Sequence, residues 1–129
     1  MISVAKCYIA LIWTSWMSIV IYLTGGFDSL FKALLIMMAL DYITGIIKGY
    51  REKNINSKRA YKGLGKKIVI LGIIAASTQI DIIFENMGVR TLVLMFYVAT
   101  EFLSILENAA ALGIPVPEKL KQALEQCRE

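Results

Sequence analysis

The sequence contains no histidine and only two cysteines, Cys7 and Cys127, which do not form a CxxC motif. Without histidine, the chain lacks the commonest general base and the commonest protein ligand of metal ions. Two cysteines far apart in the sequence indicate neither a disulfide framework nor a zinc site. We therefore expect two free thiols and a protein that is not an enzyme, with no catalytic residues, no metal site and no cofactor.

Charged residues are missing from long stretches of the sequence. Residues 7–23 carry no charge, and a helix of this length extends roughly 26 Å, close to the ~30 Å hydrocarbon core of a bilayer. This stretch follows a single lysine, Lys6, and lacks a small-residue cleavage site. It therefore predicts a retained membrane span rather than a removed signal peptide, with the mature chain starting near Met1.

The composition as a whole is that of a membrane protein. Hydrophobic residues make up 57% of the 129 residues, and the mean hydropathy is +0.63. A soluble domain of this size must expose about half of its residues to water and is normally less apolar. We therefore expect an all-α integral membrane protein with a single membrane domain.

What the sequence has in excess is a basic segment, residues 48–67, with eight lysines or arginines and one acid, Glu52. Basic loops of this length beside apolar spans stay in the cytoplasm. The segment carries +7 and the whole chain +4, so the excess charge indicates membrane orientation and not a surface for nucleic acid. Two interpretations of the segment remain open: a topology determinant alone, or also a binding site for anionic lipid.

Glycines, caps and the basic segment divide the apolar sequence into four predicted spans. These spans cover residues 7–24, 29–50, 66–84 and 89–112. They form two transmembrane helical hairpins joined by the basic cytoplasmic loop 48–67. The turn between the first two spans is short, which predicts a tight antiparallel hairpin, and Asp28-Ser29 offers an N-cap for the second helix. A cytoplasmic loop places both termini in the cytoplasm.

Beyond the fourth span, Gly113, Pro115 and Pro117 end the helix. Residues 117–127 then return to helical periodicity, with apolar residues and Cys127 on one side. We expect a short amphipathic helix at the cytoplasmic surface.

The third and fourth spans are less apolar than the first two. The third has an uncharged stretch only at residues 68–80, before Asp81, and the fourth only at residues 91–100, before Glu101. A re-entrant or interfacial hairpin is therefore the alternative to two full spans. Charged residues near the helix ends can reach the interface, which favours four spans, and we expect Asp81 to be solvated near the outer surface.

Polar residues inside the predicted spans need partners. An ionised Asp41 near the middle of the second helix costs at least ~3 kcal/mol if it faces lipid. It lies roughly 13 Å from the cytoplasmic end of that helix, and Glu101 lies similarly deep in the fourth. Because Lys66 and Lys67 open the third helix at the same level, we predict that Asp41 and Glu101 are neutralised by Lys66 or Lys67. A buried carboxylate inside the membrane either fixes the register between helices or lines an aqueous path.

Small residues accompany Asp41 on its helix. Thr44 and Gly45 follow it at helical spacing, and the Gly45-xxx-Gly49 pair permits close approach of a neighbouring helix.

Four sequence blocks carry a resemblance to a known family. They are Leu40-Asp41-Tyr42-Ile43-Thr44-Gly45, then Ser57 with Lys62-Gly63-Leu64-Gly65-Lys66-Lys67, then Glu101-Phe102-Leu103-Ser104-Ile105-Leu106-Glu107-Asn108-Ala109-Ala110, and Gly113-Ile114-Pro115-Val116-Pro117-Glu118-Lys119-Leu120. In this order they resemble the toxin-secretion/phage-lysis holin family of Gram-positive bacteria and their phages. The resemblance covers residues 33–124 and leaves out the first span.

The resemblance implies a small, multi-pass protein of the bacterial cytoplasmic membrane. Such a protein self-associates and opens lesions through which an endolysin or a toxin escapes. Its implied partners are further copies of the chain, the lipid bilayer and, as an open alternative, an antiholin. The family-matched polar and small positions expected to matter are Asp41, Thr44, Gly45, Glu101, Ser104, Glu107 and Asn108, with Lys66 and Lys67 as charge partners.

Two other classes of membrane protein remain as alternatives. A small proton-coupled multidrug exporter also has four spans and a membrane carboxylate, but such exporters carry their key Glu in the first helix, and no carboxylate occurs there in this chain. A membrane scaffold or antiholin binds a pore former without opening anything itself, and sequence does not separate this role from that of the pore former.

Overall fold

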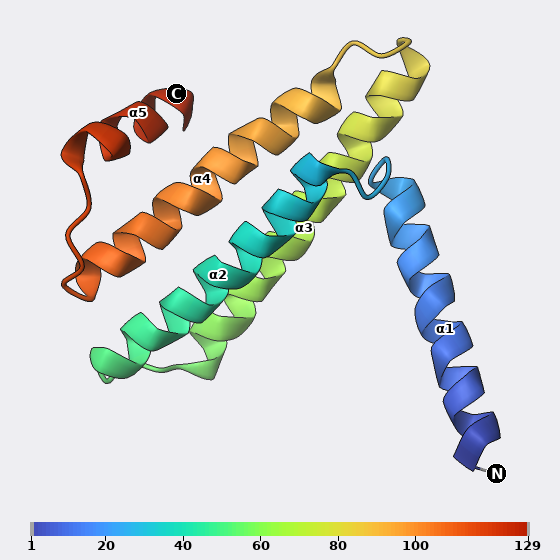
Figure 1. The fold of residues 1–129 in the computed structure, drawn as a ribbon, viewed down its shortest axis with the longest axis horizontal. Helices are drawn as coiled ribbons and strands as arrows, with labels where there is room; N and C mark the ends of the chain where they lie inside the picture. Colours follow the sequence, from blue (N-terminus) through green and yellow to red (C-terminus); the bar gives the residue numbers. More distant parts are fainter. Residues whose placement is uncertain (1, 129) are drawn as a thin grey trace.

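The computed structural model of the chain describes residues 2–128, with side chains described for residues 3–126. The described chain is helical and contains no strand. Its five helices are α1 (Ile2–Leu23), α2 (Ser29–Arg51), α3 (Ser57–Ile83), α4 (Val89–Ala111) and α5 (Glu118–Arg128) (Figure 1). Cys7 is a free, exposed thiol, whereas the side chain of Cys127 lies outside the described residues. The all-α prediction is confirmed.

Three helices within the described part of the chain are long and apolar enough to cross a membrane. They are Ser3–Leu23 in α1, Ser29–Arg51 in α2 and Val89–Ala111 in α4. The sequence also predicted a membrane span in α3, as the third of four spans. Charged residues at both ends of the apolar part of α3 keep that helix outside this set.

The ends of α2 and α3 follow from their caps. Of the predicted Asp28-Ser29 pair, Asp28 is the N-cap of α2 and accepts a hydrogen bond from the Phe31 N–H at 3.0 Å. Asn56 caps α3 in the same manner through the Lys58 N–H, so α3 begins at Ser57 and not at residue 66. The prediction of a long loop at residues 48–67 is therefore wrong. Lysine, arginine and alanine are good helix formers, so only residues 52–56 form a turn.

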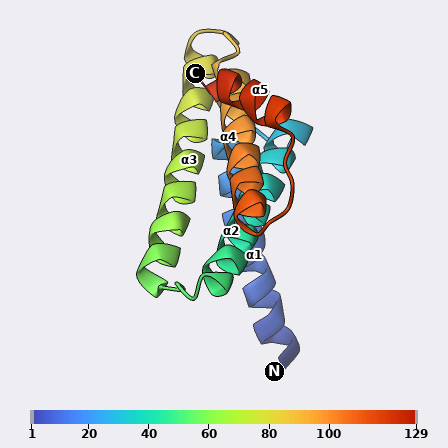
Figure 2. The ribbon, with the colours of Figure 1, turned by 90° about the vertical axis from the view of Figure 1, so that its left-hand side faces the viewer.

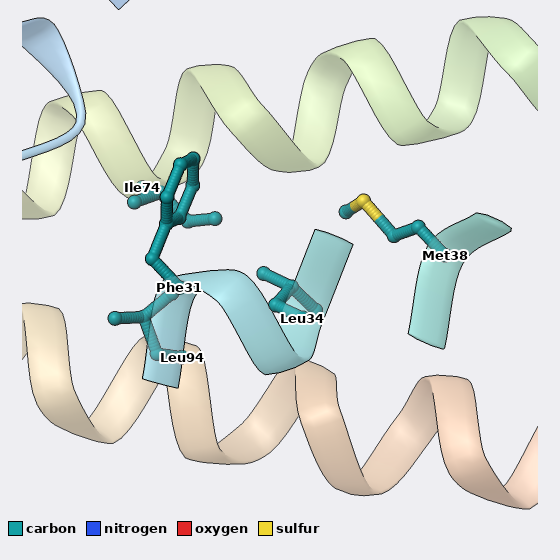
Figure 3. Close-up of a cluster of buried hydrophobic side chains, with 5 residues drawn as sticks. All are labelled: Phe31, Leu34, Met38, Ile74 and Leu94. Atoms are coloured by element: carbon teal, nitrogen blue, oxygen red, sulfur yellow. The ribbon is translucent and has the colours of Figure 1, made fainter. Parts of the chain in front are cut away.

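Helices α2, α3 and α4 pack into a bundle (Figures 1 and 2). Figure 3 shows its apolar core, in which Phe31 and Leu34 of α2 meet Ile74 of α3 and Leu94 of α4, and all four are at most 1% exposed. Met38 continues the core along α2. Lipid is as apolar as these side chains, so in a membrane the core stabilises the bundle mainly through close packing.

Helix α1 does not form the predicted tight hairpin with α2. It points away from the bundle (Figure 1), and none of its apolar span is buried. Even Trp13 and Trp16 are about 65% exposed. The turn between α1 and α2 contains Gly25 and Gly26, both with positive φ. Contacts with α4 hold the backbone of this turn. In this conformation α1 extends away from α2.

Helix α5 is the predicted amphipathic helix, and it folds back along α4 (Figure 2). Gly113, with φ of +87°, allows the chain to reverse after α4. The position of α5 at a membrane surface stays a prediction.

Two glycines with the same φ allow a matched test of the α1–α2 turn. Gly25 and Gly113 both have φ of +87°, but a Cβ at Gly25 would lie 2.6 Å from Arg90 Nε, whereas a Cβ at Gly113 would meet no atom within 4 Å. Each Gly→Ala change strains the backbone by about 1–2 kcal/mol. We expect Gly25→Ala to lower the unfolding midpoint in detergent micelles further than Gly113→Ala. Equal shifts would show that the Arg90 contact contributes nothing.

Candidate functional site

The centre of the α2–α3–α4 bundle contains a cluster of three charged side chains, one from each helix. Lys67 Nζ of α3 donates to Asp41 Oδ2 of α2 at 2.9 Å and to Glu101 Oε2 of α4 at 2.8 Å. The side chains of Lys67, Asp41 and Glu101 are 15%, 19% and 6% exposed. None of the three therefore faces the lipid side of the bundle.

Two uncharged side chains complete the cluster. Asn108 Nδ2 of α4 donates to Asp41 Oδ1 at 3.1 Å and to the Thr44 hydroxyl at 3.0 Å. It also approaches the Asp41 carbonyl at 3.3 Å. Both oxygens of the Asp41 carboxylate thus accept a hydrogen bond, one from Lys67 and one from Asn108. Among the described residues, no buried polar side-chain atom lacks a partner.

Helical geometry explains why these residues meet. Glu101 and Asn108 are two turns apart on one face of α4, and Asp41 and Thr44 are one turn apart on α2. Lys67 points into the bundle, while its neighbour Lys66 is rotated by about 100° and is exposed, with no ion pair among the described side chains. Of the two predicted partners, Lys67 alone pairs with Asp41 and Glu101, and its single positive charge balances one of the two negative charges.

Three other expected positions lie outside these contacts. Gly45 faces Asn108, but an added Cβ would stay 3.8 Å from Asn108 Nδ2, an ordinary contact, so the approach of α2 and α4 does not require glycine here. Ser104 is half-buried and Glu107 is exposed. Neither forms a side-chain hydrogen bond or ion pair with any described residue.

The cluster acts as an electrostatic cross-link between three helices. Two carboxylates and one ammonium group in low-dielectric surroundings stabilise one another only while all three remain together. Removing one partner of such a group costs about 3–5 kcal/mol, because the others become unpaired buried charges. Across the described residues, no three His, Cys, Asp or Glu side chains gather to form a metal site.

A second polar cluster lies at one end of the bundle, around Arg90 at the start of α4. Arg90 Nε donates to the Thr24 carbonyl at 2.6 Å, and its Nη2 donates to the Gly26 carbonyl at 3.1 Å. Its Nη1 donates to Asp28 Oδ2 at 2.8 Å. The hydrogen bond from Arg90 to the Asp28 carboxylate lowers the pKa of Asp28 below its ordinary value, and the Arg90 contacts together fix the α1–α2 turn to α4.

Asp81 of α3 belongs to the same end of the bundle. Its carboxylate accepts hydrogen bonds from the Val89 and Arg90 N–H groups at 2.9 and 3.0 Å. It caps α4 because Gly88, at the N-cap position, has no side chain. The prediction that Asp81 is merely solvated is therefore wrong. One signal in the sequence was the cation Arg90 at a helix N-terminus, where the helix dipole disfavours positive charge unless acids lie nearby.

Contacts at the two ends of the bundle show that α2 and α4 run in the same direction. At one end, the N-cap of α2, Asp28, pairs with Arg90 at the start of α4. At the other end, Arg51 in the last turn of α2 donates to the Leu112 carbonyl at the end of α4. Helix α3 connects these two ends.

Comparison with known proteins identifies the family. The model of the bacteriophage holin family matches residues 18–129, which include both polar clusters and all helices except most of α1. The chain belongs to the bacteriophage holin family. As a holin-family member with three long apolar helices, it is a holin-type membrane protein.

Relatives of similar length occur in several bacteria. An uncharacterised 14.9 kDa protein of the nagH 3′ region in Clostridium perfringens is 43% identical over 107 residues, which are 81% of each chain. The uncharacterised protein Lmo0128 of Listeria monocytogenes is 40% identical, over 80% of this chain and 74% of its own. YqxH of Bacillus subtilis, also uncharacterised, is 33% identical, over 81% and 75%. No solved structure matches the chain significantly.

Neighbouring lysines of this holin-family chain provide a test of the central cluster. We expect Lys67→Met to lower the free energy of unfolding in micelles by about 3–5 kcal/mol, because two buried carboxylates lose their counter-charge. Lys66→Met, which removes an exposed lysine, should change it by no more than about 0.5 kcal/mol. Adding Asp41→Asn and Glu101→Gln to Lys67→Met should restore much of the loss, since no buried charge remains. Similar losses at Lys66 and Lys67 would contradict the cluster.

Proposed function

We propose that this chain is a holin that self-associates in the bacterial cytoplasmic membrane and permeabilises it, releasing an endolysin or a toxin. The observation that carries the proposal is the family match over residues 18–129, which includes the buried Lys67 cluster. A holin performs no bond chemistry, so its function depends on how helices pack and separate within lipid.

The parallel arrangement of α2 and α4 supports four membrane spans. If two parallel helices both cross a bilayer in the same direction, the chain between them has to cross back. That chain is α3, whose uncharged part after Lys67 covers about 20 Å up to Ile80. Lys67 is the charge of α3 that lies deepest in the bundle, and its pairing with Asp41 and Glu101 removes the main obstacle to burying this helix.

The charge distribution supports an orientation with both termini in the cytoplasm. The lysines and arginines of residues 48–67 lie in the last turn of α2, at the α2–α3 turn and in the first half of α3, and such segments remain in the cytoplasm. The α1–α2 and α3–α4 turns are then external, and the end of α4 faces the cytoplasm with α5 beyond it.

The packed core supports a pore that forms between copies and not through one copy. Phe31, Leu34, Ile74 and Leu94 fill the space between α2, α3 and α4 with almost no exposure. A passage for a protein is much wider than any gap within three helices. We propose that copies assemble through the lipid-facing surfaces of the bundle and of α1, and that the Lys67 cluster keeps each copy closed to water until then.

Cysteine labelling tests the proposed orientation. In a chain with Cys7 and Cys127 replaced by Ser, we expect Asn54→Cys, in the α2–α3 turn, to resist an impermeant thiol reagent added to intact cells. Met87→Cys, in the exposed α3–α4 turn, should react with it. Asn54 is a better site for the cysteine than the nearby Asn56, because the Asn56 side chain caps α3. Labelling of Asn54→Cys from outside would contradict the cytoplasmic position of the basic segment.

Inducible expression in a bacterium tests permeabilisation. We expect normal growth followed by an abrupt, delayed loss of membrane potential and entry of a nucleic-acid dye. Glu101→Gln should shift the time of this loss or abolish it, because it weakens the central cluster. Glu107→Gln makes the same chemical change on the exposed side of α4 and should keep the wild-type time.

Other results of the expression experiment would indicate other functions. Tolerance of toxic cations without any loss of potential would indicate an exporter. An absence of lesions together with delayed lysis by a co-expressed holin of this family would indicate a scaffold or antiholin. Identical timing in the Glu101 and Glu107 variants would contradict the role proposed for the cluster.

A further inference from the structure

The outer face of α3 is divided into a cationic half and an apolar half. Residues three or four apart on a helix share a face, and on α3 this spacing forms a single stripe that we call the α3 outer stripe. The stripe consists of Lys58, Lys62, Lys66, Val69, Ile73, Ala76 and Ile80. All seven residues are exposed, whereas Lys67 and Ile74 point into the bundle.

The cations of the stripe form no ion pair with any side chain that the structure describes. The ion pairs among the described residues involve Lys67 and Arg90, and none includes Lys58, Lys62 or Lys66. Helix α3 contains no acid before Asp81. Like charges four residues apart on a helix repel each other by about 0.2–0.5 kcal/mol per pair. An anion bound beside these lysines would remove that repulsion.

The apolar half of the stripe has the depth of one leaflet. From Val69 to Ile80 the helix rises about 16 Å, close to half of the ~30 Å hydrocarbon core. Val69 and Ile73 are 62% and 39% exposed. A molecule that fits the whole stripe therefore carries an anionic group at one end and a hydrocarbon chain of leaflet length at the other.

The geometry points to a binding site for an anionic phospholipid on the α3 outer stripe, with the phosphate among Lys58, Lys62 and Lys66 and an acyl chain along Val69 and Ile73. The charge and the depth select a lipid over a soluble anion, because a soluble anion would leave the apolar half unused. Nucleic acid is disfavoured for the same reason. Lys67 belongs to the protein interior, so the lipid site and the central cluster use opposite faces of α3. The inference does not depend on permeabilisation.

Lipid titration of the purified full chain in a non-ionic detergent, followed by native mass spectrometry, tests the site. We expect phosphatidylglycerol to bind about a hundredfold more tightly than phosphatidylcholine. The variant Lys58→Gln/Lys62→Gln/Lys66→Gln should bind phosphatidylglycerol about a hundredfold more weakly, given the attraction of each lysine to anionic lipid. Its binding of phosphatidylcholine should not change.

Three controls separate this site from general charge and from misfolding. The variant Lys48→Gln/Lys53→Gln/Lys119→Gln removes the same charge away from the stripe and should bind like the wild type. Replacing the three stripe lysines by Arg should preserve binding, while Val69→Ser/Ile73→Ser should weaken the binding of both lipids. Circular dichroism should show equal helicity in all variants.

Three results would overturn the proposal. They are equal binding of phosphatidylglycerol and phosphatidylcholine by the wild type, an equal loss in both Lys→Gln triple variants, and displacement of phosphatidylglycerol by glycerol 3-phosphate at equal concentration. The last result would identify a site for free phosphate groups and not for lipid.

Discussion

The arrangement of α2, α3 and α4 depends on one lysine held between two carboxylates from the other two helices. A charged side chain at the centre of a bilayer costs about 2.5–3.5 kcal/mol on insertion scales, so none of the three groups can remain alone in hydrocarbon. Contacts of 2.8 and 2.9 Å from Lys67 to Glu101 and Asp41 fix the depth of each helix relative to the other two. A shift of one helical turn would separate charges by about 5 Å. Apolar packing alone would resist such a shift less, because lipid replaces the lost contacts.

The ends of the bundle are fixed by other means, which reflect their exposure to water. Arg90 joins Asp28 and two turn carbonyls at one end, and Arg51 reaches the end of α4 at the other. The Asp28 side chain is 51% exposed, and an ion pair of that exposure contributes about 0.2–1 kcal/mol. Register is therefore set mainly by the central cluster, while the end contacts direct the turns. Helix α1 has neither kind of contact along its length, which explains why it leaves the bundle although it is as apolar as α2.

The sequence predicted a contact correctly where only a few residues were close enough to make it. Asp41 and Glu101 lie at one depth among apolar residues, and only Lys66 and Lys67 were near enough to neutralise them, so their pairing followed. Asp81 and Arg90 could not be placed in this way, because water is an adequate partner for charges near a helix end. The start of α3 was missed because lysine and arginine mark a cytoplasmic segment without indicating whether it is helical. The direction of α1 depends on the backbone of Gly25 and Gly26 and leaves no trace in hydrophobic periodicity.

The contact between α4 and α5 has a consequence for how the C-terminal part can behave in a membrane. Helix α5 carries five charged residues among eleven and lies against α4, which is long and apolar enough to span. Leu103 is only 1% exposed, although it lies about 200° around α4 from Glu101, on the side away from the charge cluster. That side of α4 is therefore covered, and α5 contacts α4 from outside the bundle. Five charges cannot stay at that depth in hydrocarbon, so lipid and α5 exclude each other from this face of α4. Insertion of α4 into a bilayer then requires α5 to move to the surface, and a docked α5 requires water beside α4.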